Sequence, residues 1–136
     1  MTCVVADDND AILAALASLL SDEGIEILGK ARSGEEAVQL VEREQPATLV
    51  VDVRLPDFDG VEVARRVGEL ARPRPAVILY TSYADGCLVG RALDVGARGV
   101  VLKDAPPQNL LDAIAFVAGG GTYIDPRLRR GPRRAP

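Results

Sequence analysis

Apolar residues occur along the chain in short continuous runs, separated by longer stretches in which apolar positions repeat with helical spacing. Continuous runs are typical of parallel strands covered on both faces, and helical spacing indicates amphipathic helices. The runs predict five strands, at residues 2–6, 25–31, 48–53, 76–81 and 99–103. The stretches between and after them predict five helices, at 10–21, from 33 to before Pro46, at 61–70, 85–97 and 107–118. The pattern therefore predicts an α/β fold with helices on both faces of a parallel sheet.

Local signals set several of these helix boundaries. Ser33 is a suitable N-cap, and Glu36 three residues later completes a predicted capping box. Pro107 suits the first turn of the last helix, and the glycines at 119–121 end it. The helix at 85–97 is the weakest prediction, because each of its three glycines costs about 1 kcal/mol relative to alanine in a helix interior.

Length and composition favour one globular domain. The 136 residues are 48% hydrophobic and 26% charged, which is enough for one conventional core but leaves no room for a second domain. No apolar run reaches the roughly 18 residues of a membrane span. The acidic sequence ADDND begins at residue 6, which is unlike a secretory signal. We therefore expect a cytoplasmic protein that does not contact a membrane.

The charge is distributed unevenly along the chain. The net charge of -4 combines an acidic body with a terminal segment, residues 126–136, that contains five arginines and no acid. An acidic body argues against a broad nucleic-acid surface. Because the arginines alternate with prolines, without aromatic residues, we interpret the terminal segment as an unfolded linker or chain end rather than a nucleic-acid-binding element.

Polar residues follow four of the predicted strands. They are Asp7, Asp8, Asp52, Thr81, Ser82 and Lys103. In an open parallel α/β sheet, ligands bind beyond the carboxyl ends of the strands, so these side chains are expected at one edge. Each acid alone is an ordinary turn former or helix cap. Their convergence from separate strands is what points to a functional site.

Three carboxylates at one edge repel one another unless a cation compensates, which predicts a divalent-metal site. All-oxygen ligands favour Mg²⁺, with Mn²⁺ as the alternative, and the chain contains no histidine to serve as a base or metal ligand. An ionised aspartate can attack phosphorus and form an acyl phosphate, with Lys103 supplying positive charge and Thr81 a hydroxyl donor. Thr81 would move when its hydroxyl donates to a phosphoryl oxygen, so phosphorylation would change the conformation of the neighbouring loop.

At this point the sequence resembles the receiver domain of two-component response regulators, from about residue 2 to 125. The resemblance rests on DD at 7–8, DVRLPDFDG at 52–60, YTS at 80–82 and GVVLKD at 99–104. It implies a flavodoxin-like receiver fold, whose five-stranded parallel sheet has the order 2-1-3-4-5 with five helices on both faces. It also implies a receiver domain at 1–121 and a C-terminal extension or linker at 122–136.

The same resemblance assigns roles to site residues. Asp8 and Asp52 would bind Mg²⁺ directly together with the backbone carbonyl of Arg54, and Asp7 would act mainly through water. Asp52 would accept the phosphoryl group from a histidine of a sensor kinase.

Other residues complete the pattern of that family. Thr81 and Lys103 would hold the phosphoryl group, assisted by the backbone N–H of Ser82, and Pro56 and Gly60 would shape the loop after Asp52.

The resemblance extends to a subfamily and includes one departure. ARGVVLKD followed by a helix and GGGTYIDP is similar to receivers that precede a LuxR-type (NarL/FixJ-like) helix-turn-helix. This implies transcriptional output through a DNA-binding domain absent from this chain, and homodimer formation on phosphorylation. Receivers often have an aromatic residue three positions before the lysine, but here Val100 stands there. Aromatic gating at that position is excluded, and Tyr80 or Tyr83 is the candidate substitute.

Three alternatives remain beside this interpretation. A stand-alone receiver would act through protein partners. A Mg²⁺-dependent aspartyl phosphatase would need an acid two residues after the nucleophile, where Arg54 stands, and an arginine does not protonate a leaving group at neutral pH. A flavodoxin-like cofactor binder would need a phosphate-binding loop after the first strand, where the acidic ADDND sequence repels phosphate. We therefore expect a phospho-accepting signalling domain, not an enzyme acting on a separate substrate.

Overall fold

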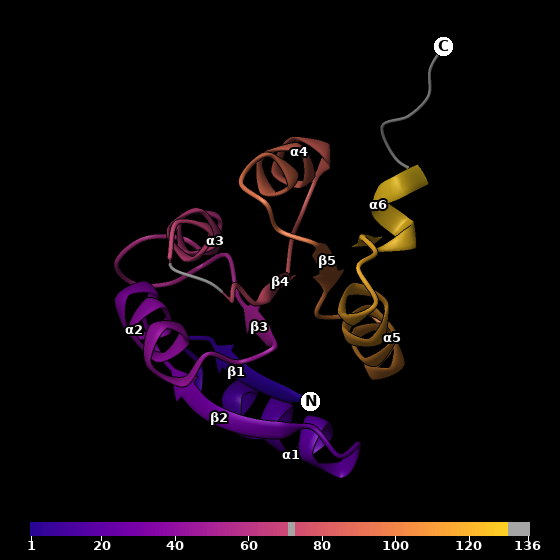
Figure 1. Cartoon of the computed structure of the whole chain (residues 1–136). Coiled ribbons are helices and arrows are strands. Elements are labelled where there is room, and N and C mark those ends of the chain that lie inside the picture. The colour runs from indigo at the N-terminus through magenta and orange to yellow at the C-terminus, as the bar shows by residue number, and fades with distance from the viewer. Residues whose placement is uncertain (71–72, 131–136) are drawn as a thin grey trace.

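The computed structural model describes residues 1–70 and 73–130, which alternate between strands and helices (Figure 1). The strands are β1 (Thr2–Ala6), β2 (Glu26–Ala31), β3 (Thr48–Val51), β4 (Ala76–Thr81), β5 (Gly99–Leu102) and β6 (Tyr123–Ile124). The helices are α1 (Asp10–Asp22), α2 (Gly34–Glu44), α3 (Gly60–Gly68), α4 (Gly86–Asp94), α5 (Pro107–Ala118) and α6 (Pro126–Arg130). The predicted α/β fold is confirmed.

All strand pairs are parallel, and the sheet order is β2-β1-β3-β4-β5-β6. The strand order reverses direction at β1, because β2 lies on one side of it and β3 to β6 lie on the other. Such a reversal is where open α/β sheets bind ligands. The predicted order 2-1-3-4-5 is confirmed for the first five strands.

Helices cover both faces of the sheet. Figure 1, which looks nearly along the strands, shows α1 and α5 on one face and α2, α3 and α4 on the other. Two buried apolar clusters result, because successive strand residues point to opposite faces. One contains Val4, Leu49 and Leu79 beneath α2 to α4, and the other contains Val5 and Ile78 beneath α1 and α5. Burial on both faces explains why the strands are continuously apolar.

The helix caps agree with the sequence in most details. Ser33 caps α2, and its side chain accepts a hydrogen bond from the Glu36 N–H at 3.1 Å. In a capping box, the carboxylate of Glu36 accepts a hydrogen bond from the backbone N–H of the cap residue, Ser33. Here it accepts instead from the N–H of Arg32, one residue before the cap, at 2.6 Å, so this part of the prediction is wrong. Asp59 and Asp85 cap α3 and α4 in the same way as Ser33 caps α2.

The predicted count of five strands and five helices is too low by one of each. β6 pairs with β5, and Leu128 of α6 packs against the cluster under α2 to α4. The sheet thus continues beyond residue 121, where the sequence placed the start of a linker. Only 131–136 of that predicted linker lies outside the described residues. A two-residue strand is too short to give a periodic signal, which is why the pattern missed it.

The helix with three glycines is shorter than predicted. It was expected over 85–97 but spans Gly86–Asp94, with Val95 as its C-cap. Gly96 follows with a φ of 96°, a left-handed conformation that glycine adopts without strain. Within the described residues, no helix has both the length and the apolar character needed to cross a membrane.

Gly60 is required by close packing rather than by its backbone conformation. A Cβ atom at Gly60 would overlap the backbone carbonyl oxygen of Asp52, whereas a Cβ at Gly90 would meet nothing within 4 Å. The start of α3 therefore approaches Asp52, the residue that follows β3, too closely for any side chain.

We predict opposite effects for the same substitution at these two glycines. Gly60→Ala should lower the free energy of unfolding by about 1–3 kcal/mol, because backbone must move to accept the methyl group. Gly90→Ala, inside α4, should raise it by about 0.5–1 kcal/mol through helix propensity. Urea denaturation followed by circular dichroism measures both. Equal effects at the two positions would contradict the packing argument.

Candidate functional site

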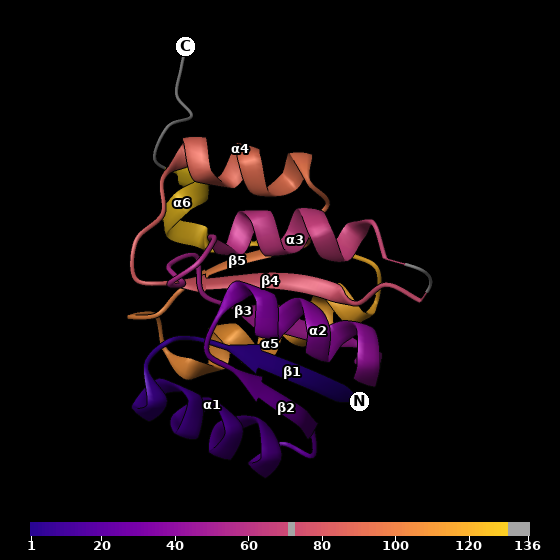
Figure 2. The same ribbon diagram turned by 90° about the vertical axis from the view of Figure 1, so that its left-hand side faces the viewer.

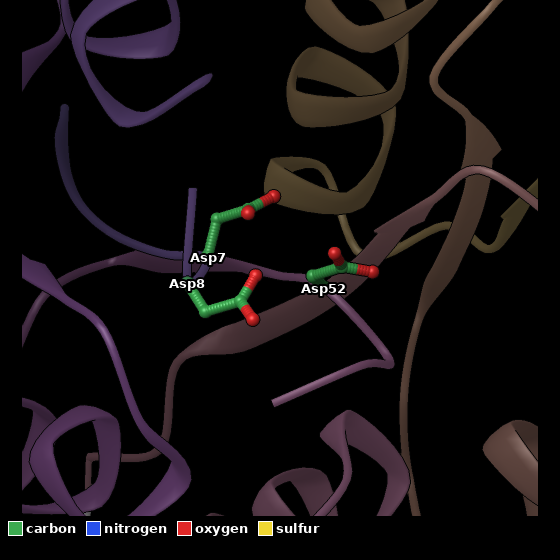
Figure 3. A group of neighbouring side chains, drawn as sticks. All are labelled: Asp7, Asp8 and Asp52. Atoms are coloured by element: carbon green, nitrogen blue, oxygen red, sulfur yellow. The ribbon is translucent and has the colours of Figure 1, made fainter. Parts of the chain in front are cut away.

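Three aspartates meet at the carboxyl edge of the sheet. Asp7 and Asp8 follow β1, Asp52 follows β3, and the Asp52 N–H donates to the carbonyl of Ala6 at 3.0 Å, which continues the pairing of the two strands. One carboxylate oxygen of each aspartate lies within 4.8 Å of those of the other two. Figure 3 shows the three side chains converging. Asp7 and Asp52 are 1% and 7% exposed, and Asp8 is exposed to solvent.

Lys103 joins this group at the same edge of the sheet, from the far side of β4. It follows β5, and its ammonium lies 2.5 Å from Asp7 Oδ2 and 2.8 Å from Asp52 Oδ2. Its side chain is 13% exposed, so both ion pairs are largely shielded from water. In the sheet order, the contact with Asp52 spans one intervening strand, β4, and the contact with Asp7 spans two, β3 and β4. A long side chain is needed to make them.

The electrostatics of the site are set by burial and by this lysine. Burial raises the pKa of the Asp7 carboxyl, and Lys103 opposes that shift only in part. Burial also disfavours the ammonium of Lys103, but its hydrogen bonds to Asp52 and Asp7 outweigh this effect and raise its pKa. Lys103 therefore stays charged at neutral pH, while the aspartates carry more negative charge than one lysine balances.

The donor set fits a hard divalent cation. Three carboxylates surround the site and one ammonium compensates them, which leaves a net negative charge of the kind that attracts Mg²⁺ or Mn²⁺. Asp8 is exposed to solvent, so the group of carboxylates is open to water on its side. The site thus has the charge and the oxygen ligands that were predicted for a metal.

Thr81, Ser82 and Arg54 lie around this group. Thr81 ends β4, is 3% exposed, and accepts the Lys103 N–H on its carbonyl at 2.8 Å. Ser82 follows and is exposed. The Arg54 N–H donates to Asp52 Oδ1 at 3.3 Å, so the loop after β3 folds back over the carboxylate. All the predicted site residues therefore lie at the same edge, and hydrogen bonds join Asp7, Asp52, Arg54, Thr81 and Lys103.

Asp57 anchors the loop that contains Arg54. Its carboxylate accepts from the N–H groups of Gly34 and Glu35 at 2.7 and 2.9 Å, at the start of α2. An aspartate in a loop is by itself an ordinary turn former. The role was not predictable locally, because these partners lie 23 and 22 residues away.

The aromatic residues near the site differ in exposure. Tyr80 is partly buried, and burial raises the pKa of its phenol. Tyr83 is 69% exposed and its hydroxyl lies 3.5 Å from Asp85. Val100 is fully buried. Whether either tyrosine replaces an aromatic switch at position 100 stays a prediction.

Comparison with known proteins gives a consistent match. Residues 3–115 match the family model for the response regulator receiver domain. The chain is 34% identical over 125 residues to the transcriptional regulatory protein DesR of Bacillus subtilis (strain 168), covering 91% of this chain and 61% of DesR. It is 32% identical over 126 residues to the transcriptional regulatory protein LnrK of the same organism, covering 92% of this chain and 57% of LnrK. The chain thus spans less than two thirds of these relatives.

A solved structure matches as well. The signal receiver domain of the putative response regulator NarL from Mycobacterium tuberculosis superposes with a TM-score of 0.82 at 30% identity, covering 88% of this chain and 96% of that domain.

Neutralising Asp7 is predicted to stabilise the metal-free protein. Its pKa is raised in the folded state, so the folded protein binds this proton more tightly than the unfolded chain. Stability contributed by Asp7 is therefore present at low pH and lost as pH rises from the unfolded pKa through the folded one. At pH 7 without metal, Asp7→Asn should therefore raise the free energy of unfolding.

Thermal unfolding with EDTA and with millimolar MgCl₂ measures this effect. Mg²⁺ should stabilise the wild type more than Asp7→Asn, because the variant has lost one carboxylate of the cation site. Asp22→Asn, an exposed acid at the end of α1, is the matched control and should behave as wild type. A metal-free Asp7→Asn protein less stable than wild type would contradict the argument that burying the ionised Asp7 carboxylate costs stability.

Proposed function

This chain belongs to the response regulator receiver domain family, and we propose from this membership and the site geometry that Asp52 accepts a phosphoryl group from a partner histidine kinase. The observation that carries the proposal is the position of Asp52. It is a buried carboxylate at a strand end, 2.8 Å from a lysine ammonium and beside two further aspartates. Such a carboxylate has little reason to be buried unless it serves chemistry, because burial without full compensation costs stability.

In the proposed reaction an oxygen of Asp52 forms a bond to phosphorus while the bond from phosphorus to the donor histidine nitrogen breaks. The imidazole leaves with that electron pair and takes up a proton. Lys103, already beside Asp52 Oδ2, would hold a phosphoryl oxygen, and the Thr81 hydroxyl and Ser82 N–H would hold others. These donors oppose the charge that accumulates on the transferred group.

Asp8, Asp52 and the Arg54 carbonyl would hold Mg²⁺ directly, with Asp7 acting mainly through water. When bound, the ion supplies positive charge that reduces repulsion between the carboxylates and the incoming phosphoryl group. The raised pKa of Asp7 and the unbalanced charge of the three aspartates both support a resident cation.

The proposed output is transcriptional regulation in the cytoplasm. Two relatives, DesR and LnrK, are named as transcriptional regulatory proteins, and this chain spans 57–61% of their lengths. A LuxR-type DNA-binding domain outside this chain would then carry the output, and phosphorylation would favour a homodimer. A stand-alone receiver that acts on protein partners is the alternative. A phosphatase is disfavoured, because Arg54 occupies the position where that chemistry needs an acid.

Phosphoryl transfer is tested by intact-mass spectrometry after incubation with Mg²⁺ and acetyl phosphate. Wild type should gain about 80 Da, the mass of one phosphoryl group, and Asp52→Asn should not. Omitting Mg²⁺ should also prevent the gain. The matched control is Asp22→Asn, which changes an exposed aspartate at the end of α1 and should keep the adduct. An unmodified wild type that also binds no beryllofluoride, a phosphoryl mimic, would refute the proposal.

A further inference from the structure

Asp125 is a buried carboxylate outside the site described so far. It lies between β6 and α6 and is 1% exposed. Its Oδ2 accepts the N–H of Leu102 at 3.1 Å, and its Oδ1 accepts the N–H of Arg127 at 3.0 Å. Its own N–H donates to the carbonyl of Val100 at 2.8 Å. A carboxylate held by backbone donors on two segments fixes those segments relative to each other.

A second contact joins the same segments. The guanidinium of Arg127 lies 2.7 Å from the carboxylate of Asp104. Both side chains are largely exposed, so this pair contributes little stability by itself. Its position is what matters, because Asp104 follows Lys103 directly and Leu102 precedes it. The C-terminal segment therefore contacts the residues on both sides of Lys103.

This arrangement bears on the direction of the lysine side chain. The Lys103 N–H donates to the Thr81 carbonyl, which ties the residue to β4 on one side. The contacts of Asp125 and Arg127 hold its neighbours on the opposite side, where β6 and α6 follow the edge of β5 (Figures 1 and 2). Because the ammonium crosses the end of β4 to meet Asp7 and Asp52, a small rotation of the backbone at 102–104 would displace it.

We propose that residues 123–128 complete the phosphorylation site by positioning Lys103, and that Asp125 is the positioning residue. The segment lies beyond residues 3–115, which match the receiver family model. The inference rests on the proposed function, because it assigns Lys103 the role of holding the phosphoryl group. It adds that the end of the described chain is coupled to that site.

Coupling of this kind is reciprocal. If docking of β6 and α6 places Lys103 for phosphoryl binding, then occupation of the site strengthens the docking by the same factor. Beryllofluoride with Mg²⁺ should therefore slow hydrogen exchange of the Leu102 and Arg127 amides in the wild type, since both donate to Asp125. Amides at the far end of the sheet, such as Gly24 N–H, serve as the internal reference.

Two variants test the role of Asp125 in the full chain. Asp125→Asn keeps the size of the side chain but has one acceptor oxygen instead of two, so it must release Leu102 or Arg127. It should bind beryllofluoride with Mg²⁺ about fivefold more weakly, the loss expected for one hydrogen bond. Asp125→Ala should lose more. The ¹⁵N signal of the Lys103 ammonium should shift in both variants before any ligand is added. Glu69→Gln, an exposed acid paired with Arg65 on α3, is the control and should match wild type.

The outcomes separate this inference from the proposed function. A wild type that fails to bind beryllofluoride refutes the function, and the inference with it. A wild type that binds, with folded Asp125 variants that bind equally well, refutes the positioning role alone. If the Asp125 variants do not fold, the exchange measurement on wild type decides, since unchanged Leu102 and Arg127 amides would overturn the coupling. Arg127→Ala, at an exposed side chain, provides a further variant that should weaken binding and shift the Lys103 signal in the same direction.

Discussion

Repulsion among three carboxylates is the constraint on which the rest of this site depends. The parallel pairing of β1 with β3 brings Asp7 and Asp52 to one edge, and burial prevents water from screening them. Compensation by Lys103 requires a side chain that crosses the end of β4. The residues at that crossing, Thr81 and Ser82, are correspondingly short. Charge balance therefore accounts for the aspartates and the lysine at three strand ends, and the space that the lysine side chain needs accounts for the short residues at the end of β4.

The sequence alone predicted the features whose signals lie within a few neighbouring residues, namely buried strands and helix caps. Continuous apolar runs predicted β1 to β5, because each strand is buried on both faces, and Ser33 correctly marked the start of α2. β6 escaped because two residues show no period, although Asp125 followed by Pro126 is a helix-start signal that pattern reading could have used. The arginine content of 126–130 favoured a linker, yet Leu128 within it packs against the core.

The part of the site that was not predictable consists of contacts between distant segments. Strand-end acids and the lysine could be anticipated, because the geometry of a parallel sheet brings strand ends together whatever lies between them. Asp57 and Asp125 could not, since the amides that they bind lie 22–23 residues away and nothing in the local pattern identifies them. The overlap that a side chain at Gly60 would make with the Asp52 carbonyl is of the same kind. Such contacts fix the loops and strand ends on which the proposed site residues lie.

The burial of Val100 constrains how a change at Asp52 could leave the site. A short aliphatic side chain that is fully buried has little freedom to change its rotamer. The interior of β5 is therefore poorly suited to transmit a conformational change. The termini of β4 and β5 are better placed, because the Lys103 N–H donates to the Thr81 carbonyl and the Lys103 ammonium contacts Asp52. A displacement there acts on two neighbours at once. On one side it moves the loop that contains Tyr83 and leads into α4, and on the other it moves Asp104 and the segment held by Asp125. In a receiver with valine at position 100, the ends of the two strands therefore join the proposed phosphorylation site to the surface through a series of polar contacts.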